Sequence, residues 1–197
     1  LEEYGKTLYY QYKNIIEYLI SRGYLVKIFE GIYYVKSREE FNSNIIKLTP
    51  LELISECLKL KSIQKWYFGL YTALTLNGIK NNHDQEIYVL NDHIFKPKPT
   101  KIKRYKLKFL QVKSNLLNFG ILKDKVYYSD LEKTILDFIY LWKFNEKNNA
   151  AIIQNISNYL KYVSKEKIIR YSREYPESNR KILKELISNP KIRKKVR

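Results

Sequence analysis

The sequence predicts an α+β protein in two parts, a small N-terminal helix-and-hairpin module and a larger mixed domain with a helical C-terminal part. Three observations support this prediction: a helix-to-hairpin pattern opens the chain, helix and strand patterns alternate in the middle, and helical patterns fill the last quarter. At 197 residues, the chain can hold a small module and a second domain. Hydrophobic residues make up 45% of it, so we expect a packed core.

Residues 15–35, which read IIEYLISRGYLVKIFEGIYYV, carry the clearest local pattern. Apolar residues first recur at spacings of three and four, which predicts a helix, and Gly23 directly after them is a typical helix stop. Two strand-type runs follow, Tyr24–Phe29 and Ile32–Val35, and the Glu-Gly pair between them is typical of a tight hairpin. This is the order of a recognition helix and its wing, so residues 1–36 are predicted to form a winged-helix-like DNA-binding module.

The predicted recognition helix offers side chains of the kinds that contact DNA. Gln and Asn can read adenine, whereas Lys contacts phosphate. The N-terminal half of such a helix enters the major groove in helix-turn-helix proteins. An ordinary solvated helix surface is the alternative interpretation of the same residues. The expected DNA-binding residues are Tyr9, Tyr10, Gln11, Lys13 and Asn14 in the helix and Lys27 in the hairpin.

One feature departs from an ordinary winged helix. One or two helices normally precede the recognition helix, whereas only Leu1–Leu8 do so in this sequence. Either those helices lie upstream of Leu1 or the module is degenerate. The chain contains no methionine, so we expect that Leu1 is not the natural start.

The next segments predict a linker and the start of a second domain. Residues 37–48 are polar and are predicted to be a linker, which leaves residues 49–197 as the second domain. Thr49-Pro50-Leu51-Glu52 is a capping box with proline at the first helical position, and it predicts a helix to about Leu60. Trp66–Asn77 is almost wholly apolar and predicts a buried helix that ends before a glycine.

The rest of the chain predicts a strand, a hairpin and four helices. Glu86–Leu90 is a strand pattern, and Phe119–Leu122 with Val126–Tyr128 predicts the hairpin. Ser129-Asp130-Leu131-Glu132 is a second capping box, which predicts the start of a helix. Three further helices are expected near Asn149–Tyr162, Ser164–Tyr175 and Ser178–Ser188.

The net charge of +17 is concentrated in one half of the chain. Residues 1–36 have a net charge of +1 and residues 37–95 of −1, whereas residues 96–197 carry 26 Lys and Arg against nine Asp and Glu. The 19 Tyr and the abundant Lys are also typical of an A/T-rich genome, which would raise the charge without any acidic partner. Such a bias does not explain why only one half is basic.

Lys96–Lys113 contains eight basic residues and no acidic one. Within it, Arg104, Lys106 and Lys108 alternate with apolar side chains, which predicts a strand with one basic and one apolar face. Such a face can bind phosphate or an acidic protein, or it can be a solvated outer strand guarded by lysines. The tail Lys191–Arg197 is also basic. The later helices add a second basic cluster: Arg170, Arg173, Arg180 and Lys181.

The sequence offers little catalytic chemistry. His83 and His93 are ten residues apart, a spacing that matches no metal motif, and are expected to be loop or surface residues. The six glycines form no phosphate-binding loop. Glu132 is interpreted as the capping-box residue, and Thr134 and Asp137 are expected to hold neighbouring groups in place. We therefore predict no enzyme activity, no metal and no cofactor.

Cysteine and hydropathy favour a cytoplasmic location. The single cysteine, Cys57, lies among leucine and isoleucine and is expected to be buried and reduced. No apolar run approaches the length of a membrane span, and no signal-peptide pattern opens the chain. We therefore expect no membrane association.

Three segments together resemble the AbiEi family of bacterial and archaeal antitoxins. The family's "G-L-x-R-I-x-x-G-x-Y" segment is similar to Gly23–Tyr33, and its "Y-x-x-x-x-S-A-L-x-x-H-G-L" helix is similar to Tyr67–Ile79. In the latter, Thr72 replaces Ser and Asn77 replaces His. The family's "E-R-T-L-L-D" segment is matched by Glu132–Asp137, which reads EKTILD.

This resemblance covers about residues 8–190. It implies a winged helix followed by an antitoxin domain, and a non-catalytic antitoxin of a type IV toxin–antitoxin pair. Such a protein binds double-stranded operator DNA as a transcriptional autoregulator and opposes a nucleotidyltransferase-like toxin. The alternative is a stand-alone DNA- or RNA-binding regulator without a toxin partner.

Overall fold

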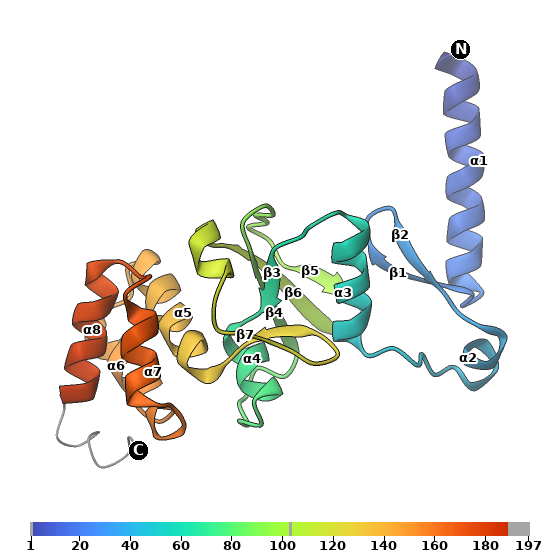
Figure 1. Cartoon of the computed structure of the whole chain (residues 1–197). Helices are drawn as coiled ribbons and strands as arrows, with labels where there is room; N and C mark the ends of the chain where they lie inside the picture. Colours follow the sequence, from blue (N-terminus) through green and yellow to red (C-terminus); the bar gives the residue numbers. More distant parts are fainter. Residues whose placement is uncertain (1, 103, 189–197) are drawn as a thin grey trace. The chain divides into compact units, whose positions relative to one another are not determined.

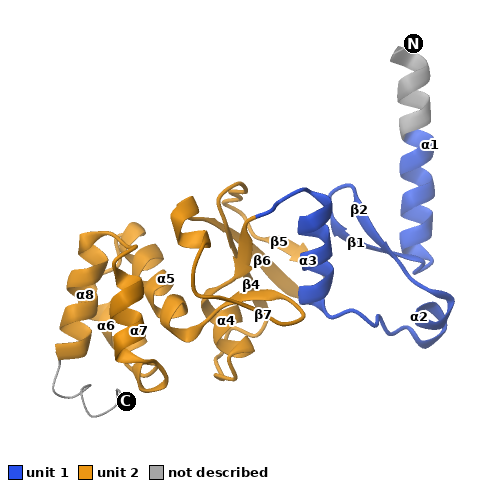
Figure 2. Ribbon diagram, viewed as in Figure 1, with its two compact units in different colours: residues 1–64 blue, residues 65–197 orange. Residues whose placement is uncertain are grey.

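The computed structural model describes residues 2–102 and 104–188, with only the backbone for residues 2–9 (Figure 1). The basic tail Lys191–Arg197 lies outside the described residues. Within them, the chain is α+β, as predicted, with eight α-helices and two β-sheets. It divides into two compact units, residues 1–64 and residues 65–197 (Figure 2). None of the described helices has the length and apolar character that a membrane span requires.

Unit 1 begins with a long helix and a hairpin, in the predicted order. Gly23 has a φ of +79° just after the first helix, and Gly31 has a φ of +75° in the turn of the hairpin. Both values lie in the left-handed region that glycine adopts without cost, so the predicted helix stop and tight turn are confirmed. The elements of unit 1 are α1 Glu2–Ser21, β1 Leu25–Phe29, β2 Ile32–Val35, α2 Arg38–Ser43 and α3 Pro50–Leu60.

The segment predicted as a linker contains a helix, α2. Ser37 and Glu40 form a reciprocal capping box, in which each side chain accepts a hydrogen bond from the backbone N–H of the other. The Glu40 carboxylate also accepts hydrogen bonds from the hydroxyl of Tyr34 (2.7 Å) and the backbone N–H of Lys47 (2.8 Å). This carboxylate therefore ties the residues after the hairpin together, and the prediction of a plain linker was wrong.

The helix that was expected to open the second domain belongs to unit 1. Its predicted capping box is present, because Thr49 accepts from the backbone of Glu52 and the Glu52 carboxylate accepts from the backbone of Thr49. The helix α3 contacts β1, and its Cys57 is buried, as predicted, and forms no disulfide. Unit 1 therefore extends to residue 64, beyond the expected boundary at residue 36.

Unit 2 is built on a mixed six-stranded sheet in the order β5-β6-β4-β3-β8-β7. The pairs β4–β6 and β3–β8 are parallel, and the other three pairs are antiparallel. Its strands are β3 Trp66–Phe68, β4 Glu86–Asn91, β5 Thr100–Ile102, β6 Tyr105–Gln111, β7 Ile121–Lys123 and β8 Tyr127–Ser129. Its helices are α4 Leu70–Leu76, α5 Leu131–Phe144, α6 Asn149–Ile156, α7 Lys165–Ser172 and α8 Glu177–Ser188, with short 3-10 helices η1 Ser114–Leu117 and η2 Leu160–Tyr162.

The helix α5 lies at the centre of unit 2. It contacts α4, α6, α7 and α8, and Ile135, Leu136 and Ile139 on it are fully buried. The strand β4 is buried on both faces from Ile87 to Leu90, which is typical of a central strand. The helical C-terminal part and the predicted strand and hairpin are thus present, and they form a single core with α4 and α5.

Two predicted helix starts were wrong. The predicted helix Trp66–Asn77 is a strand, β3, followed by the shorter α4, because Gly69 is extended between them and Tyr67 pairs with Leu90 of β4. Bulky aromatic residues fit a strand as well as they fit a helix. The second capping box is also shifted by one residue, since Asp130 caps α5 by accepting from the backbone N–H of Lys133.

Candidate functional site

The predicted DNA-binding residues lie in the middle of α1. The helix runs from Glu2 to Ser21, so Tyr9, Tyr10 and Gln11 fall in its N-terminal half, as was expected, whereas Lys13 and Asn14 do not. The side chains of Gln11 and Asn14 are exposed and three residues apart, and therefore lie on one face of the helix. Lys13 is also exposed, 3.8 Å from the carboxylate of Glu17.

Two further predicted DNA-binding residues have described side chains. Tyr10 is exposed on α1, as are its neighbours Tyr12 and Tyr18. Lys27 is exposed on β1, in the hairpin that follows the helix. The side chain of Tyr9 lies outside the described residues. Unit 1 thus presents amide, aromatic and lysine side chains to solvent within one helix and hairpin.

The basic strand of the sequence is β6, and its alternation is confirmed. Leu107 and Phe109 are buried, whereas Lys106 is exposed. Arg104 precedes the strand, and its guanidinium donates a hydrogen bond of 2.8 Å to the hydroxyl of Tyr105. Lys108 is half-buried and bonded to acidic and phenolic groups, which sequence reasoning did not foresee.

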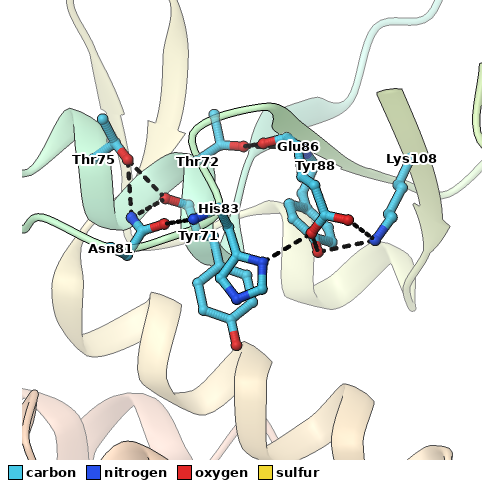
Figure 3. Close-up of polar contacts among 8 residues, drawn as sticks. All are labelled: Tyr71, Thr72, Thr75, Asn81, His83, Glu86, Tyr88 and Lys108. Carbon is cyan, nitrogen blue, oxygen red and sulfur yellow. Dashed lines mark hydrogen bonds and ion pairs between the residues drawn. The ribbon is translucent and has the colours of Figure 1, made fainter. Parts of the chain in front are cut away.

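Lys108 belongs to a polar cluster around the carboxylate of Glu86 (Figure 3). One Glu86 oxygen lies 2.6 Å from the Lys108 ammonium. The other oxygen lies 2.5 Å from the Tyr88 hydroxyl and 3.0 Å from Nδ1 of His83. The parallel pairing of β4 with β6 sets this geometry, because it places Glu86 opposite Lys106 and Tyr88 opposite Lys108.

The cluster stabilises the charged form of Glu86. Burial acts to raise the pKa of this carboxyl, but the bonds from Lys108, Tyr88 and His83 outweigh it and lower the pKa to about 2. Burial and the adjacent Glu86 carboxylate raise the pKa of Tyr88, which therefore remains a hydrogen-bond donor. The arrangement holds a carboxylate that is already bonded on both oxygens.

The loop before β4 positions His83 over an aromatic ring. The His83 imidazole stacks on the ring of Tyr71 in α4, with 3.7 Å between centroids (Figure 3). Asn81 accepts from the backbone N–H of His83 and donates to the Thr75 hydroxyl, so α4 fixes the loop. His83 is a half-exposed loop residue, as predicted, but its pairing with Glu86 was missed. The His-x-x-Glu spacing at a strand start was the available signal.

The second predicted basic cluster lies on the C-terminal helices, away from β6 within unit 2 (Figure 1). Arg170 in α7 and Arg173 directly after it are exposed, and Arg180 in α8 is half-buried. The ammonium of Lys181 lies 3.1 Å from the carboxylate of Glu177. The structure therefore presents two separate basic regions in unit 2.

Glu132 joins two helices and does not cap its own. Its carboxylate accepts a hydrogen bond of 2.8 Å from the backbone N–H of Ser164, the cap residue of α7. The Lys167 ammonium bridges Glu132 (3.0 Å) and Asp130 (3.1 Å). Thr134, one turn on from Asp130, donates its hydroxyl to the backbone oxygen of Asp130. These contacts tie the start of α5 to α7.

Asp137 is fully buried and accepts three hydrogen bonds. They come from the hydroxyls of Tyr67 (2.8 Å) and Tyr175 (2.6 Å) and from the Lys133 ammonium (3.3 Å). Lys133 is itself buried, 4.6 Å from the ring centroid of Phe119. The buried pair Lys133–Asp137 thus joins β3, α5 and the segment before α8.

Metal ligation and similarity to known proteins add no further assignment. Among the described residues, no group of three or more His, Cys, Asp or Glu side chains is placed to hold a metal ion. No protein-family model matches the sequence, and no curated protein is similar to it at a significant level.

Proposed function

We propose that this protein is the non-catalytic antitoxin of a type IV toxin–antitoxin pair and that it also binds operator DNA to regulate its own gene. The observation that carries the proposal is a contact between two segments that resemble AbiEi motifs. Tyr67 begins one segment, and its hydroxyl donates to Asp137 at the end of the other. Lys133 of the second segment completes the buried network. The two segments therefore contribute to one buried network of unit 2.

The exposed residues of unit 1 support the DNA-binding part of the proposal. Gln11 and Asn14 can each form two hydrogen bonds with adenine, and Lys13 and Lys27 can contact phosphate. All four are exposed in the helix and hairpin of unit 1. This role would place the protein in the cytoplasm, where operator DNA is located.

The charge distribution supports a second, acidic partner for unit 2. Unit 1 carries nine Lys and Arg against eight Asp and Glu, whereas unit 2 carries 28 against 12. The nearly neutral helix-and-hairpin module does not account for this excess. An acidic surface of a nucleotidyltransferase-like toxin fits the exposed Arg104 and Lys106 on one side of unit 2 and Arg170 and Arg173 on another.

The DNA-binding part is tested with the duplex that lies upstream of the protein's own gene. Binding to this duplex and to random DNA of equal length is measured at one fixed salt concentration. The double variant Gln11→Ala, Asn14→Ala should lose about tenfold or more in discrimination, because each bidentate base contact contributes about 1–3 kcal/mol. Asn42→Ala, in the exposed face of α2, is the control and should keep it. An unchanged ratio in the double variant would remove α1 from base readout.

The antitoxin part is tested by co-expression with the nucleotidyltransferase-like protein encoded beside this gene. The proposal expects that the toxin alone arrests growth and that this chain restores it. Failure to restore growth, together with sequence-specific DNA binding, would instead favour the stand-alone regulator.

A further inference from the structure

Unit 2 contains an open pocket at the carboxyl ends of the parallel strands β4 and β6 and at the end of α5. Its volume is about 640 Å³. Its apolar lining consists of Phe95, Leu110, Val112, Tyr140, Leu141 and Phe144. The carboxyl ends of parallel strands are a common place for binding sites, and this volume lies in the usual range for them.

Two phenylalanines that line the pocket remain exposed to solvent. Phe95 is 65% exposed and Phe144 is 78% exposed. Phe144 is the most exposed large hydrophobic side chain among the described residues. Exposed apolar side chains that converge on one concave surface, here from a loop and from a helix end, mark an interaction site better than scattered ones do.

The loop that carries Phe95 is held in place. The buried Asn91 accepts hydrogen bonds from the backbone N–H groups of His93 and Ile94, and its amide donates to the backbone oxygen of Ile94 (3.1 Å). Next to it, the carboxylate of Asp92 accepts from the hydroxyl of Ser114 (2.8 Å). The pocket rim is therefore preorganised, which lowers the entropic cost of binding.

The segments that form the pocket are basic. The charged residues that line it are Lys113 and Asp92, and the segments 92–98, 110–114 and 140–147, which contribute the lining, carry four further lysines and one further acidic residue. One of these acidic residues, Asp92, is already bonded to Ser114. The ammonium of Lys96 lies 5.9 Å from the ring centroid of Phe109, and Lys113 is an exposed pocket residue. An occupant should therefore combine an apolar side chain with negative charge.

We propose that this pocket binds an acidic segment of a partner protein, which inserts a large aromatic side chain between Phe95 and Phe144. A second copy of this chain fits poorly, because unit 2 carries 28 basic against 12 acidic residues. The chain's own tail, Lys191–Arg197, also fits poorly, because its net charge is positive. The proposal goes beyond the proposed function, since the pocket lies at the opposite end of β6 from Arg104 and requires neither DNA nor a toxin.

The test uses a fluorescein-labelled peptide with one Trp between runs of Asp and Glu, and binding to the full chain is followed by fluorescence anisotropy. Phe144→Ala and the double variant Phe95→Ala, Phe144→Ala should weaken binding by about tenfold or more, as expected for a central aromatic contact. Tyr162→Ala removes an aromatic side chain that is 49% exposed outside the pocket and should bind like the unmodified protein. Circular dichroism checks that each variant is folded.

Two further peptides separate apolar insertion from charge. Replacing the Trp of the peptide by Ala should reduce affinity about as much as Phe144→Ala does, and replacing its acidic residues by Lys should abolish binding. Equal binding of the Trp and Ala peptides, or of the unmodified protein and the double phenylalanine variant, would overturn the proposal. Absence of binding to the acidic Trp peptide, or self-association through these phenylalanines in sedimentation experiments, would overturn it as well.

Discussion

Asp137, which is buried and accepts three hydrogen bonds, is expected to contribute strongly to the stability of unit 2. Burial raises the pKa of this carboxyl, and the adjacent Lys133 acts in the opposite direction. Asp137→Asn would leave the Lys133 ammonium buried without a charged partner. Breaking a buried pair in this way costs about 3–5 kcal/mol. We expect a loss of this size in urea unfolding followed by tryptophan fluorescence, since Trp66 and Trp142 both lie in unit 2.

The double variant Lys133→Met, Asp137→Asn is the control for this expectation. Replacing both partners of a buried pair removes the unpaired charge, so the double variant should lose less stability than the sum of the single variants. If the double variant loses as much unfolding free energy as the two single variants together, the residues do not stabilise the fold as a pair. The losses would then come from packing alone.

Glu40 is expected to make the stability of unit 1 sensitive to acid. The backbone N–H groups of Lys47 and Ser37 and the hydroxyl of Tyr34 lower the pKa of this carboxyl from 4.5 to about 2. The unfolded chain therefore takes up this proton first, and stability present above about pH 4.5 is lost as the pH falls towards 2. The protection factors of the amides in unit 1, which correct for the intrinsic pH dependence of hydrogen exchange, should fall across this range.

Two variants test whether Glu40 causes this pH dependence. Glu40→Gln should remove the acid-dependent change in exchange and lower the protection of unit 1 at neutral pH, because a neutral amide accepts these hydrogen bonds less well. Glu39→Gln, which changes the neighbouring exposed carboxylate paired with Lys47, should retain it. A Glu40→Gln protein with an unchanged acid response would contradict this assignment.

Some of these residues could be foreseen from the sequence and others could not. Thr134 and Asp137 were expected to hold neighbouring groups, and their hydrogen bonds agree with that expectation. Glu40 was hidden in a polar run, although the Ser-x-x-Glu spacing was present. The pairing of Glu86 with Lys108 depends on the register of β4 with β6, which no local pattern encodes.

At the scale of elements, Gly120 and Gly78 differ in the space that is available for an added side chain. Gly120 has a φ of +62°, and a Cβ there would lie 2.9 Å from Cβ of Lys133 and 2.9 Å from the ring of Tyr171. Gly78 has a φ of +79°, and a Cβ there would meet nothing within 4 Å. Gly78→Ala should therefore cost about 1–2 kcal/mol from backbone strain alone, and Gly120→Ala should cost more. Urea unfolding with tryptophan detection measures both, and equal losses would contradict the predicted clash.

Local signals predicted elements well where a turn residue or a helix cap fixed a boundary. Gly23 and Gly31 located the helix end and the hairpin of unit 1. Trp66–Asn77 was misassigned because a uniformly apolar run has no periodicity that separates a buried strand from a buried helix. The pairing of Tyr67 with Leu90 decides that question, and it joins residues far apart in the sequence.

At the scale of the molecule, the sequence predicted the α+β class and the asymmetry of charge. It did not predict the boundary after residue 64, because the packing of α3 with β1 is a tertiary contact. The alternation in the sequence also predicted that Arg104, Lys106 and Lys108 form one basic face. The Glu86 carboxylate neutralises Lys108, so the available charge of this face is smaller than the alternation suggested.

The pairing of Lys108 with Glu86 changes which variant should be used to test the basic face. Lys108 should be kept, because its loss would leave Glu86 without its ammonium partner. The variant is therefore Arg104→Gln, Lys106→Gln. If this face contacted duplex DNA, each lost phosphate contact would reduce the slope of log affinity against log salt by about 0.9. We expect the slope to stay unchanged and neutralisation of the co-expressed toxin to weaken, because the charge lies outside the helix and hairpin that are proposed to read DNA. Lys123→Gln, Lys125→Gln, which removes two exposed lysines from the β7–β8 hairpin, is the charge-matched control and should leave neutralisation intact. A flatter slope with full neutralisation would instead assign the β6 face to nucleic acid.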